Sequence, residues 1–191
     1  PPAGEPPTSR GTVHPHRETP AVVERAEAME VAIQTEGLSR RYGDLLAVDN
    51  LSLTVRRGEI YGFLGSNGAG KTTTMKMLVG LLEPSAGRAC IDGHDVCREP
   101  LVAKAALGYV ADRAILYDRL TGCEFLSFLA QMRGLPRQQS EERIAKLLTV
   151  LELSDDADRL CGSYSLGMKR KLAVAGALLH QPPALIMDEP L

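Results

Sequence analysis

One eight-residue stretch, GSNGAGKT at residues 65–72, constrains what this chain can fold into more than any other. It fits the pattern G-x-x-x-x-G-K-[ST] at every fixed position. In such a loop the glycines let successive backbone N–H groups converge on an anion, and the following helix adds its positive end. Lys71 supplies a mobile positive charge for the outer phosphates, and Thr72 offers a hydroxyl to Mg²⁺. The alternative is a glycine-rich turn that only caps a helix.

The neighbouring sequence favours the phosphate-binding interpretation. EIYGFLG, residues 59–65, is mostly apolar and predicts a strand that leads into the loop. KTTTMKMLVGLL, residues 71–82, has helical periodicity and is followed by Pro84. A strand, a glycine-rich loop and a helix in this order are the context that the motif requires.

The remaining chain predicts an α/β fold. EVAIQTE (30–36), LSLTV (51–55), GRACIDG (87–93), ALGYV (106–110) and ALIMDEP (184–190) read as strands, and the helical patterns lie between and after them. We therefore expect a P-loop NTPase core with a mostly parallel sheet, an antiparallel N-terminal β-subdomain and a helical insertion at about residues 112–164. Residues 1–28 are rich in Pro, Glu, Arg and Thr and predict a disordered tail, so the ordered domain is placed at 29–191.

Three helix starts are also predicted. Thr121 and Glu124 have the spacing of a capping box, and Ser140 and Ser165 precede helical patterns as N-caps. The helix after Ser165 ends at His180, where a cation would suit the helix dipole.

Composition excludes several classes of protein. The formal net charge of −2 does not indicate a general nucleic-acid binder. No apolar run approaches the length that spans a bilayer. The four cysteines form no C-x-x-C pair and are interpreted as reduced thiols of a cytosolic protein.

A pair of acidic residues follows the last predicted strand. In LIMDE, Asp188 is predicted to hold Mg²⁺, and Glu189 to orient or deprotonate the attacking water beside the γ-phosphate. An exposed acidic turn after a strand is the alternative.

A second candidate anion site opens the preceding helix. In YSLGMKRKL, Ser165 and Gly167 lie where backbone N–H groups have no helical partner. One nucleotide does not obviously need two helix N-termini so far apart in sequence. A head-to-tail pair of chains could use both. The basic run at residues 169–171 is interpreted as a solvated helix face, with a partner contact as the alternative.

Together these motifs make residues 30–191 resemble the ATP-binding subunit of an ABC transporter. GSNGAGKTT resembles Walker A, SYSLGMKRKL the signature motif, and LIMDEP Walker B followed by the catalytic glutamate. The resemblance implies ATP and Mg²⁺ as ligands. It implies catalytic roles for Glu189 and Lys71, and metal binding by Thr72 and Asp188. Nucleotide contacts are implied for Tyr42, Gly65, Ser66, Asn67, Gly68, Ala69, Gly70, Lys71, Thr72, Thr73, Ser165 and Gly167, with Tyr42 stacking on adenine.

The resemblance also implies partners and a location. The chain is most similar to the drug and sodium exporter branch, which implies ATP hydrolysis coupled to export of a small solute or drug through an integral-membrane permease. It implies pairing with a second ATP-binding subunit, identical or different, and a cytoplasmic location on the inner face of the cell membrane. The D-loop and the switch histidine of the family would follow Glu189, so the chain is expected to be truncated at its C-terminus and weakly active alone.

Three positions depart from the family pattern, at Leu166, Met168 and Asp112. Asp112 stands where the family usually has a glutamine that touches Mg²⁺ and the attacking water. It would add negative charge near Asp188 and Glu189. A metal ligand and a loop residue that faces the membrane subunit are both open. Two other functions also stay open: a soluble ABC ATPase that is not coupled to transport, and a nucleotide-binding fragment without turnover.

Overall fold

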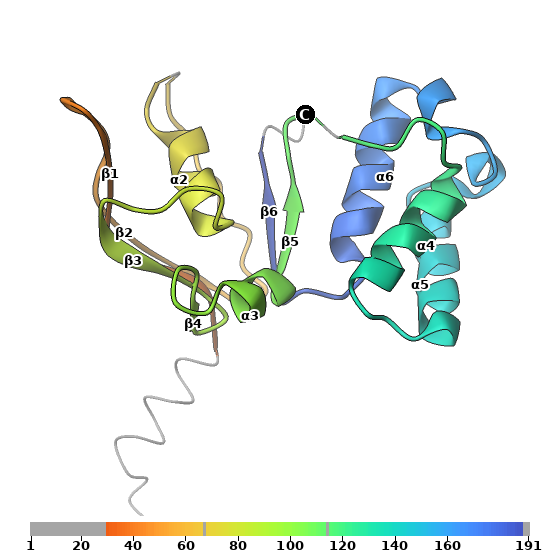
Figure 1. Ribbon diagram of the computed structural model, residues 1–191, viewed down its shortest axis with the longest axis horizontal. Helices are drawn as coiled ribbons and strands as arrows, with labels where there is room; N and C mark the ends of the chain where they lie inside the picture. The colour runs from red at the N-terminus through yellow and green to blue at the C-terminus, as the bar shows by residue number, and fades with distance from the viewer. Residues whose placement is uncertain (1–29, 67, 114, 189–191) are drawn as a thin grey trace, which may run out of the picture.

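The computed structural model describes residues 30–66, 68–113 and 115–188 of the chain. Figure 1 shows a lobe built on an antiparallel sheet, a lobe of helices, and a pair of parallel strands between them. The tail predicted for residues 1–28 lies outside the described residues. Among the described helices, none combines the length and the apolar composition that crossing a bilayer requires.

The antiparallel sheet has the strand order β2-β1-β3-β4. Its strands are β1 (Val31–Tyr42), β2 (Leu45–Arg56), β3 (Ala86–Ile91) and β4 (His94–Asp95). Strands β1 and β2 form a hairpin whose two-residue turn places Gly43 in the left-handed region, at φ 55°. Because Tyr42 pairs with Leu45 across this turn, both side chains lie at the tip of the hairpin. The predicted antiparallel β-subdomain is therefore present.

The parallel pair consists of β5 (Leu107–Val110) and β6 (Ala184–Met187). Their register pairs Leu107 with Ala184 and Val110 with Met187, so both strands end at the same edge. Helices α2 (Lys71–Leu78) and α3 (Pro100–Ala105) lie on the sheet side of this pair, and their buried side chains join one apolar core with those of the strands. The α/β fold class is confirmed.

The strand predicted for residues 59–65 is not observed. These residues form no described strand, and the side chains of Ile60 and Leu64 are 99% and 93% exposed. A strand is held by hydrogen bonds to a neighbouring strand, and none of the described strands pairs with this segment. Apolar composition alone therefore predicted the wrong local structure.

The helical lobe has its own apolar core. It is formed by α4 (Gly122–Met132), α5 (Arg137–Val150), α6 (Leu166–Leu178) and the 3₁₀ turns η1 (Ser154–Asp156) and η2 (Cys161–Ser163). Helix α6 contributes Leu172 and Ala175, and its C-cap contributes Leu179; the three recur at helical spacing and are fully buried. The second core thus reaches beyond residue 164, because α6 packs on α4 and α5.

The predicted helix caps are confirmed in two cases of three. Thr121 Oγ1 accepts from the Glu124 N–H at 3.1 Å, and Glu124 returns the bond to the Thr121 N–H at 2.9 Å. Ser165 Oγ accepts from the Met168 N–H. The Ser140 cap is wrong: α5 begins at Arg137, three residues earlier, and Pro136 occupies the N-cap position. Ser140 is buried within the first turn.

The helical lobe contacts the parallel strands closely at one glycine. A Cβ added to Gly108 of β5 would lie 2.6 Å from the Ala177 carbonyl oxygen of α6. Only glycine permits this approach of helix to strand. The end of α6 is therefore fixed beside the start of β5.

The capping box gives a prediction for stability. We expect Thr121→Ala to lower the free energy of unfolding by about 1 kcal/mol, because it removes the cap from the first turn of α4. Urea unfolding followed by circular dichroism measures this change. Thr149→Ala, at an exposed residue near the end of α5, is the control, since its hydroxyl contacts the Ala145 carbonyl and the Ser154 hydroxyl but caps no helix N-terminus, and we expect a change within about 0.5 kcal/mol. Equal losses in the two variants would contradict the prediction.

Candidate nucleotide site

The glycine-rich loop is shaped by its contact with the hairpin. Gly70 has φ 83° and forms the N-cap of α2. A Cβ at this position would lie 2.4 Å from the Ala47 carbonyl oxygen of β2. Gly68 also has a positive φ, 84°, and the Ala69 N–H donates to the Ser66 carbonyl at 3.1 Å. The loop therefore turns tightly against β2 and leads directly into α2.

Lys71 is the first residue of α2, and its side chain folds back over the loop. Its Nζ donates to the carbonyl oxygens of Gly65 at 2.6 Å and Ser66 at 3.0 Å. Lys71 is half-buried, and its ammonium forms no ion pair with any described residue. A phosphate oxygen is a stronger acceptor for an ammonium than a carbonyl, so this charge is available for a phosphate.

A single open cavity joins the loop to the hairpin tip. Its volume is about 420 Å³, within the range of small-molecule sites. One wall is Tyr42, Leu45 and Ala47, and the other is formed by loop and helix residues, namely Gly68, Gly70, Lys71, Thr72 and Thr73. The structure thus brings Tyr42 to the loop across more than twenty residues of sequence. Leu45 and Ala47 were missed from the sequence, where their place just after the Gly43 turn that follows Tyr42 was the available signal.

The Tyr42 ring is held in place by a cation. The Arg40 guanidinium carbon lies 4.7 Å from the ring centroid, and Arg40 Nη1 also donates to the Glu83 carbonyl at 2.7 Å. The Tyr42 side chain remains 44% exposed. An aromatic surface fixed beside a phosphate-type loop is suited to stacking on a planar ring.

Two acidic residues, Asp188 and Asp112, follow the two parallel strands. Asp188 comes directly after β6, its N–H donates to the Val110 carbonyl at 2.9 Å, and it is only 8% exposed. Asp112 comes two residues after β5 and is exposed. Burial raises the pKa of the Tyr109 phenol, and the negative charges of Asp188 and Asp112 raise it further. Both carboxylates therefore lie near the same edge of the strand pair.

The structure supports a cation at this edge by one observation. Asp188 is nearly buried and forms no ion pair with any described residue. A buried carboxylate needs a cationic partner, and a hard oxygen ligand suits Mg²⁺. Within the described residues, no group of three histidine, cysteine, aspartate or glutamate side chains forms a complete protein metal site. Mg²⁺ held by few protein ligands and by phosphate oxygens is consistent with this arrangement.

Two residues that the sequence assigned to the site, Asn67 and Glu189, lie outside the described residues.

Ser165 and Gly167 lie elsewhere in the chain. They stand at the start of α6, which is on the opposite side of β5 and β6 from α2 (Figure 1). A Cβ added to Gly167 would meet nothing within 4 Å, so the fold of one chain does not require glycine there. The structure does not bring these two residues to the cavity at the loop.

The basic run of α6 is largely neutralised within the chain. Lys169 Nζ lies 3.4 Å from Asp118, and Lys171 Nζ lies 2.8 Å from Glu152. These partly exposed pairs fit the predicted solvated helix face.

Known proteins match this chain over most of its length. The family model described as "ABC transporter" matches residues 48–191. The daunorubicin/doxorubicin resistance ATP-binding protein DrrA of Streptomyces peucetius is 41% identical over 83% of this chain and 48% of its own length. The ABC transporter ATP-binding protein NatA of Bacillus subtilis is 40% identical over 80% of this chain and 64% of its own length.

A solved structure agrees with the sequence relatives. It is described as the ATP binding subunit of an ABC transporter, and it superposes with a TM-score of 0.78 at 32% identity. The match covers 84% of this chain and 67% of that one. The chain thus spans about half to two thirds of the length of these relatives. With the loop, the hairpin wall and the strand-end carboxylate in place, these matches show that the chain belongs to the ATP-binding domains of ABC transporters.

Proposed function

We propose that this chain binds ATP with Mg²⁺ and hydrolyses it to drive export of a small solute or drug through a partner membrane permease. The cavity that joins Tyr42 to the glycine-rich loop carries this proposal, because it offers an aromatic wall for a base and N–H groups with a lysine for phosphates. The match to the ABC transporter family supports a role in ATP-driven transport in general.

Each residue has a role in this proposal. Tyr42 stacks on adenine, and the backbone N–H groups of residues 65–73, with Lys71, bind the phosphates. Thr72 and Asp188 hold Mg²⁺, which neutralises phosphate charge when it is bound. Glu189, by its place in the sequence, orients a water and accepts its proton. The water oxygen then bonds to the γ-phosphorus while the bond to the bridging oxygen breaks, releasing phosphate and ADP.

Ser165 and Gly167 act in a second copy or a related chain. Because they lie away from the loop of their own chain, we propose that two chains associate head to tail and that each α6 N-terminus contacts the nucleotide of its partner. The open space around Gly167 supports this, since a glycine there serves an approaching group and not the fold.

The exporter assignment and the permease partner rest on the relatives and on the surface. DrrA is named for drug resistance, and the solved relative is named as one subunit of a transporter. Leu101 on α3 and Met132 at the end of α4 are 82% and 70% exposed, and a hydrogen bond from Arg133 to the Lys104 carbonyl joins these two helices. Exposed apolar side chains on adjoining helices suit a protein partner. We place the protein in the cytoplasm, bound to the membrane through this permease.

Purification of the protein from the cells that naturally produce it tests whether it binds a membrane permease. The tagged protein, extracted with detergent from membranes, should retain an integral-membrane protein that washing at high salt does not remove. Recovery only from the soluble fraction, without such a protein, would favour the alternative of an ABC ATPase that is not coupled to transport. ATP binding without phosphate release by the purified complex would favour the alternative without turnover.

Removing the loop cation should weaken nucleotide binding. We expect Lys71→Ala to reduce ATP affinity about tenfold or more, because charge-assisted hydrogen bonds to phosphate contribute about 1.5–3 kcal/mol. Isothermal titration calorimetry with Mg²⁺ and ATP measures it. Lys76→Ala, on the exposed face of the same helix, is the matched control and should bind as the unchanged protein does. Similar losses in both variants would count against the loop as the site.

A second prediction tests whether Gly167 serves pairing of two chains and not folding of one chain. We expect Gly167→Ala to leave the free energy of unfolding within about 0.5 kcal/mol and to leave ATP binding by one chain unchanged, since its Cβ meets no atom. It should abolish ATP-dependent dimerisation, measured by analytical ultracentrifugation in the Glu189→Gln background. Dimerisation of Gly167→Ala equal to that of the Thr149→Ala control would contradict the head-to-tail pairing.

A further inference from the structure

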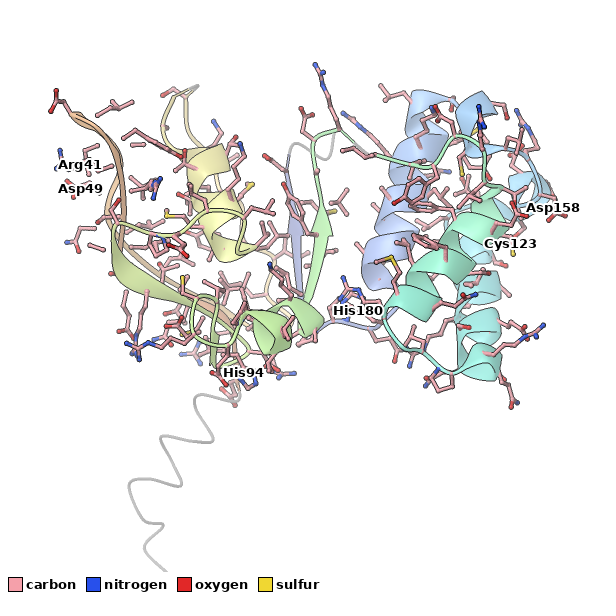
Figure 2. All side chains as sticks on the ribbon, in the orientation of Figure 1. Arg41, Asp49, His94, Cys123, Asp158 and His180 are labelled. Atoms are coloured by element: carbon pink, nitrogen blue, oxygen red, sulfur yellow. The ribbon has the colours of Figure 1, made fainter. Side chains whose placement is uncertain are left out.

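His180 lies at the junction of the two lobes and not at a free helix end. Figure 2 shows it between the helical lobe and the parallel strands. Its Nε2 is 3.0 Å from Arg133 Nη1 and 3.1 Å from the Leu107 carbonyl oxygen, and the residue is partly buried. The sequence-based interpretation of His180 as a cation that suits the helix dipole is wrong, because the neighbouring charges are positive.

The contacts of His180 and Arg133 connect four elements. Arg133 is the C-cap of α4, and its Nη1 also donates to the Lys104 carbonyl of α3 at 3.1 Å. His180 follows the end of α6 and faces the first residue of β5. The Arg143 guanidinium of α5 donates to the Leu179 carbonyl beside it. The pair therefore links the helical lobe, through α4 and α6, to the sheet lobe, through α3 and β5.

The backbone after His180 is one of the two connections between the lobes. It passes through Gln181, whose φ is 55°, and then through Pro182 and Pro183 into β6. Prolines restrict this connection, and the side-chain contacts of His180 and Arg133 add to the close approach of Ala177 and Gly108 in holding the end of α6 beside β5.

The charges around His180 favour a neutral imidazole. Arg133 faces it from α4 and Arg143 from α5, and Lys104 of α3 contributes its carbonyl to the same cluster. No acidic side chain among the described residues contributes to its titration. Burial lowers the pKa of His180, Arg133 lowers it further, and the bond to the Leu107 carbonyl only partly opposes them.

The hydrogen-bonding geometry leads to the same conclusion. In the neutral ring Nε2 carries the proton and donates to the Leu107 carbonyl, so the Arg133 guanidinium is a close cationic neighbour and not a second hydrogen-bond partner of that nitrogen. An imidazolium would carry a second N–H, at Nδ1. Nδ1 is buried and has no acceptor among the described residues. A protonated ring would therefore bury an unpaired donor and would place a second cation against Arg133.

We infer that Arg133 and His180 are positioning residues that hold the helical lobe against the strand pair while His180 is neutral, and that protonation of His180 loosens this junction. The consequence for activity rests on the proposed function: Ser165 and Gly167 lie at the start of α6, and Asp188 directly follows β6, so the junction sets how these groups are oriented for two paired chains. Mildly acid pH would then weaken closure without changing any residue that touches the nucleotide.

The sign of the stability effect follows from linkage. The folded protein binds a proton at His180 less readily than the unfolded chain, whose histidine has a pKa of about 6.5. The contribution of the neutral ring is fully present above that value and is lost as the pH falls below it. His180→Gln is the conservative variant, because an amide N–H can donate to the Leu107 carbonyl but the side chain does not titrate.

The first experiment compares unfolding free energies of the full chain, free of nucleotide, between about pH 8 and pH 5. We expect His180→Gln to match the unchanged protein near pH 8 and to lose stability less steeply toward pH 5. Thr149→Ala, at an exposed residue of α5 whose hydroxyl contacts only the Ala145 carbonyl and the Ser154 hydroxyl, removes no titratable group and should keep the original slope. An unchanged slope in His180→Gln would overturn the proposal.

The second experiment follows the junction itself by hydrogen exchange. After correction for the intrinsic rate, the Ala184 amide, which bonds the Ala106 carbonyl, should exchange about tenfold faster near pH 5.5 than near pH 7.5 in the unchanged protein. His180→Gln should not show this increase, and Arg133→Lys should raise exchange at both pH values. Equal exchange in all three proteins would reject the junction. These measurements need no ATP, so a failure of the proposed function leaves their result unaffected.

Discussion

The parallel pairing of β5 with β6 is the interaction on which the rest of the arrangement depends. These two strands are separated by more than seventy residues, and that intervening chain forms the helical lobe. Their common register ends both strands at one edge, which brings Asp112 and Asp188 near Tyr109. The same pair receives α6 at Gly108, where only hydrogen fits beside the Ala177 carbonyl. Pairing of the two strands therefore determines where Asp112 and Asp188 lie and where α6, the helix of the signature motif, packs.

The two lobes divide the proposed chemistry between them. The hairpin and the glycine-rich loop form one cavity because Gly70 packs against the Ala47 carbonyl, and this contact carries Tyr42 to the phosphate side. The helical lobe carries Ser165 and Gly167 on the far side of the strands. Because the two sets of residues lie on different lobes, a change at the junction of Arg133 and His180 alters how Ser165 and Gly167 are oriented relative to the loop.

Electrostatics differs in kind between the proposed site and the junction. At the site, Lys71 and Asp188 are opposite charges without described ionic partners, which suits a ligand that brings both phosphate and a divalent cation. At the junction, arginines crowd a single imidazole, and the stable state is the uncharged one. One region is prepared for added charge, and the other is stable only when no charge is added.

Some parts of the structure could be predicted from the sequence because their chemistry is local. Glycines at fixed spacing with Lys71 and Thr72 specify the loop, Thr121 and Glu124 specify a cap within four residues, and an acid after an apolar strand marks Asp188. Only the tertiary structure decided the rest, because it depends on contacts between distant residues. The apolar stretch at 59–65 is not a strand, since a strand needs a neighbour that composition does not reveal. Likewise, His180 looked like a helix-end cation until Arg133, forty-seven residues away in sequence, was placed beside it.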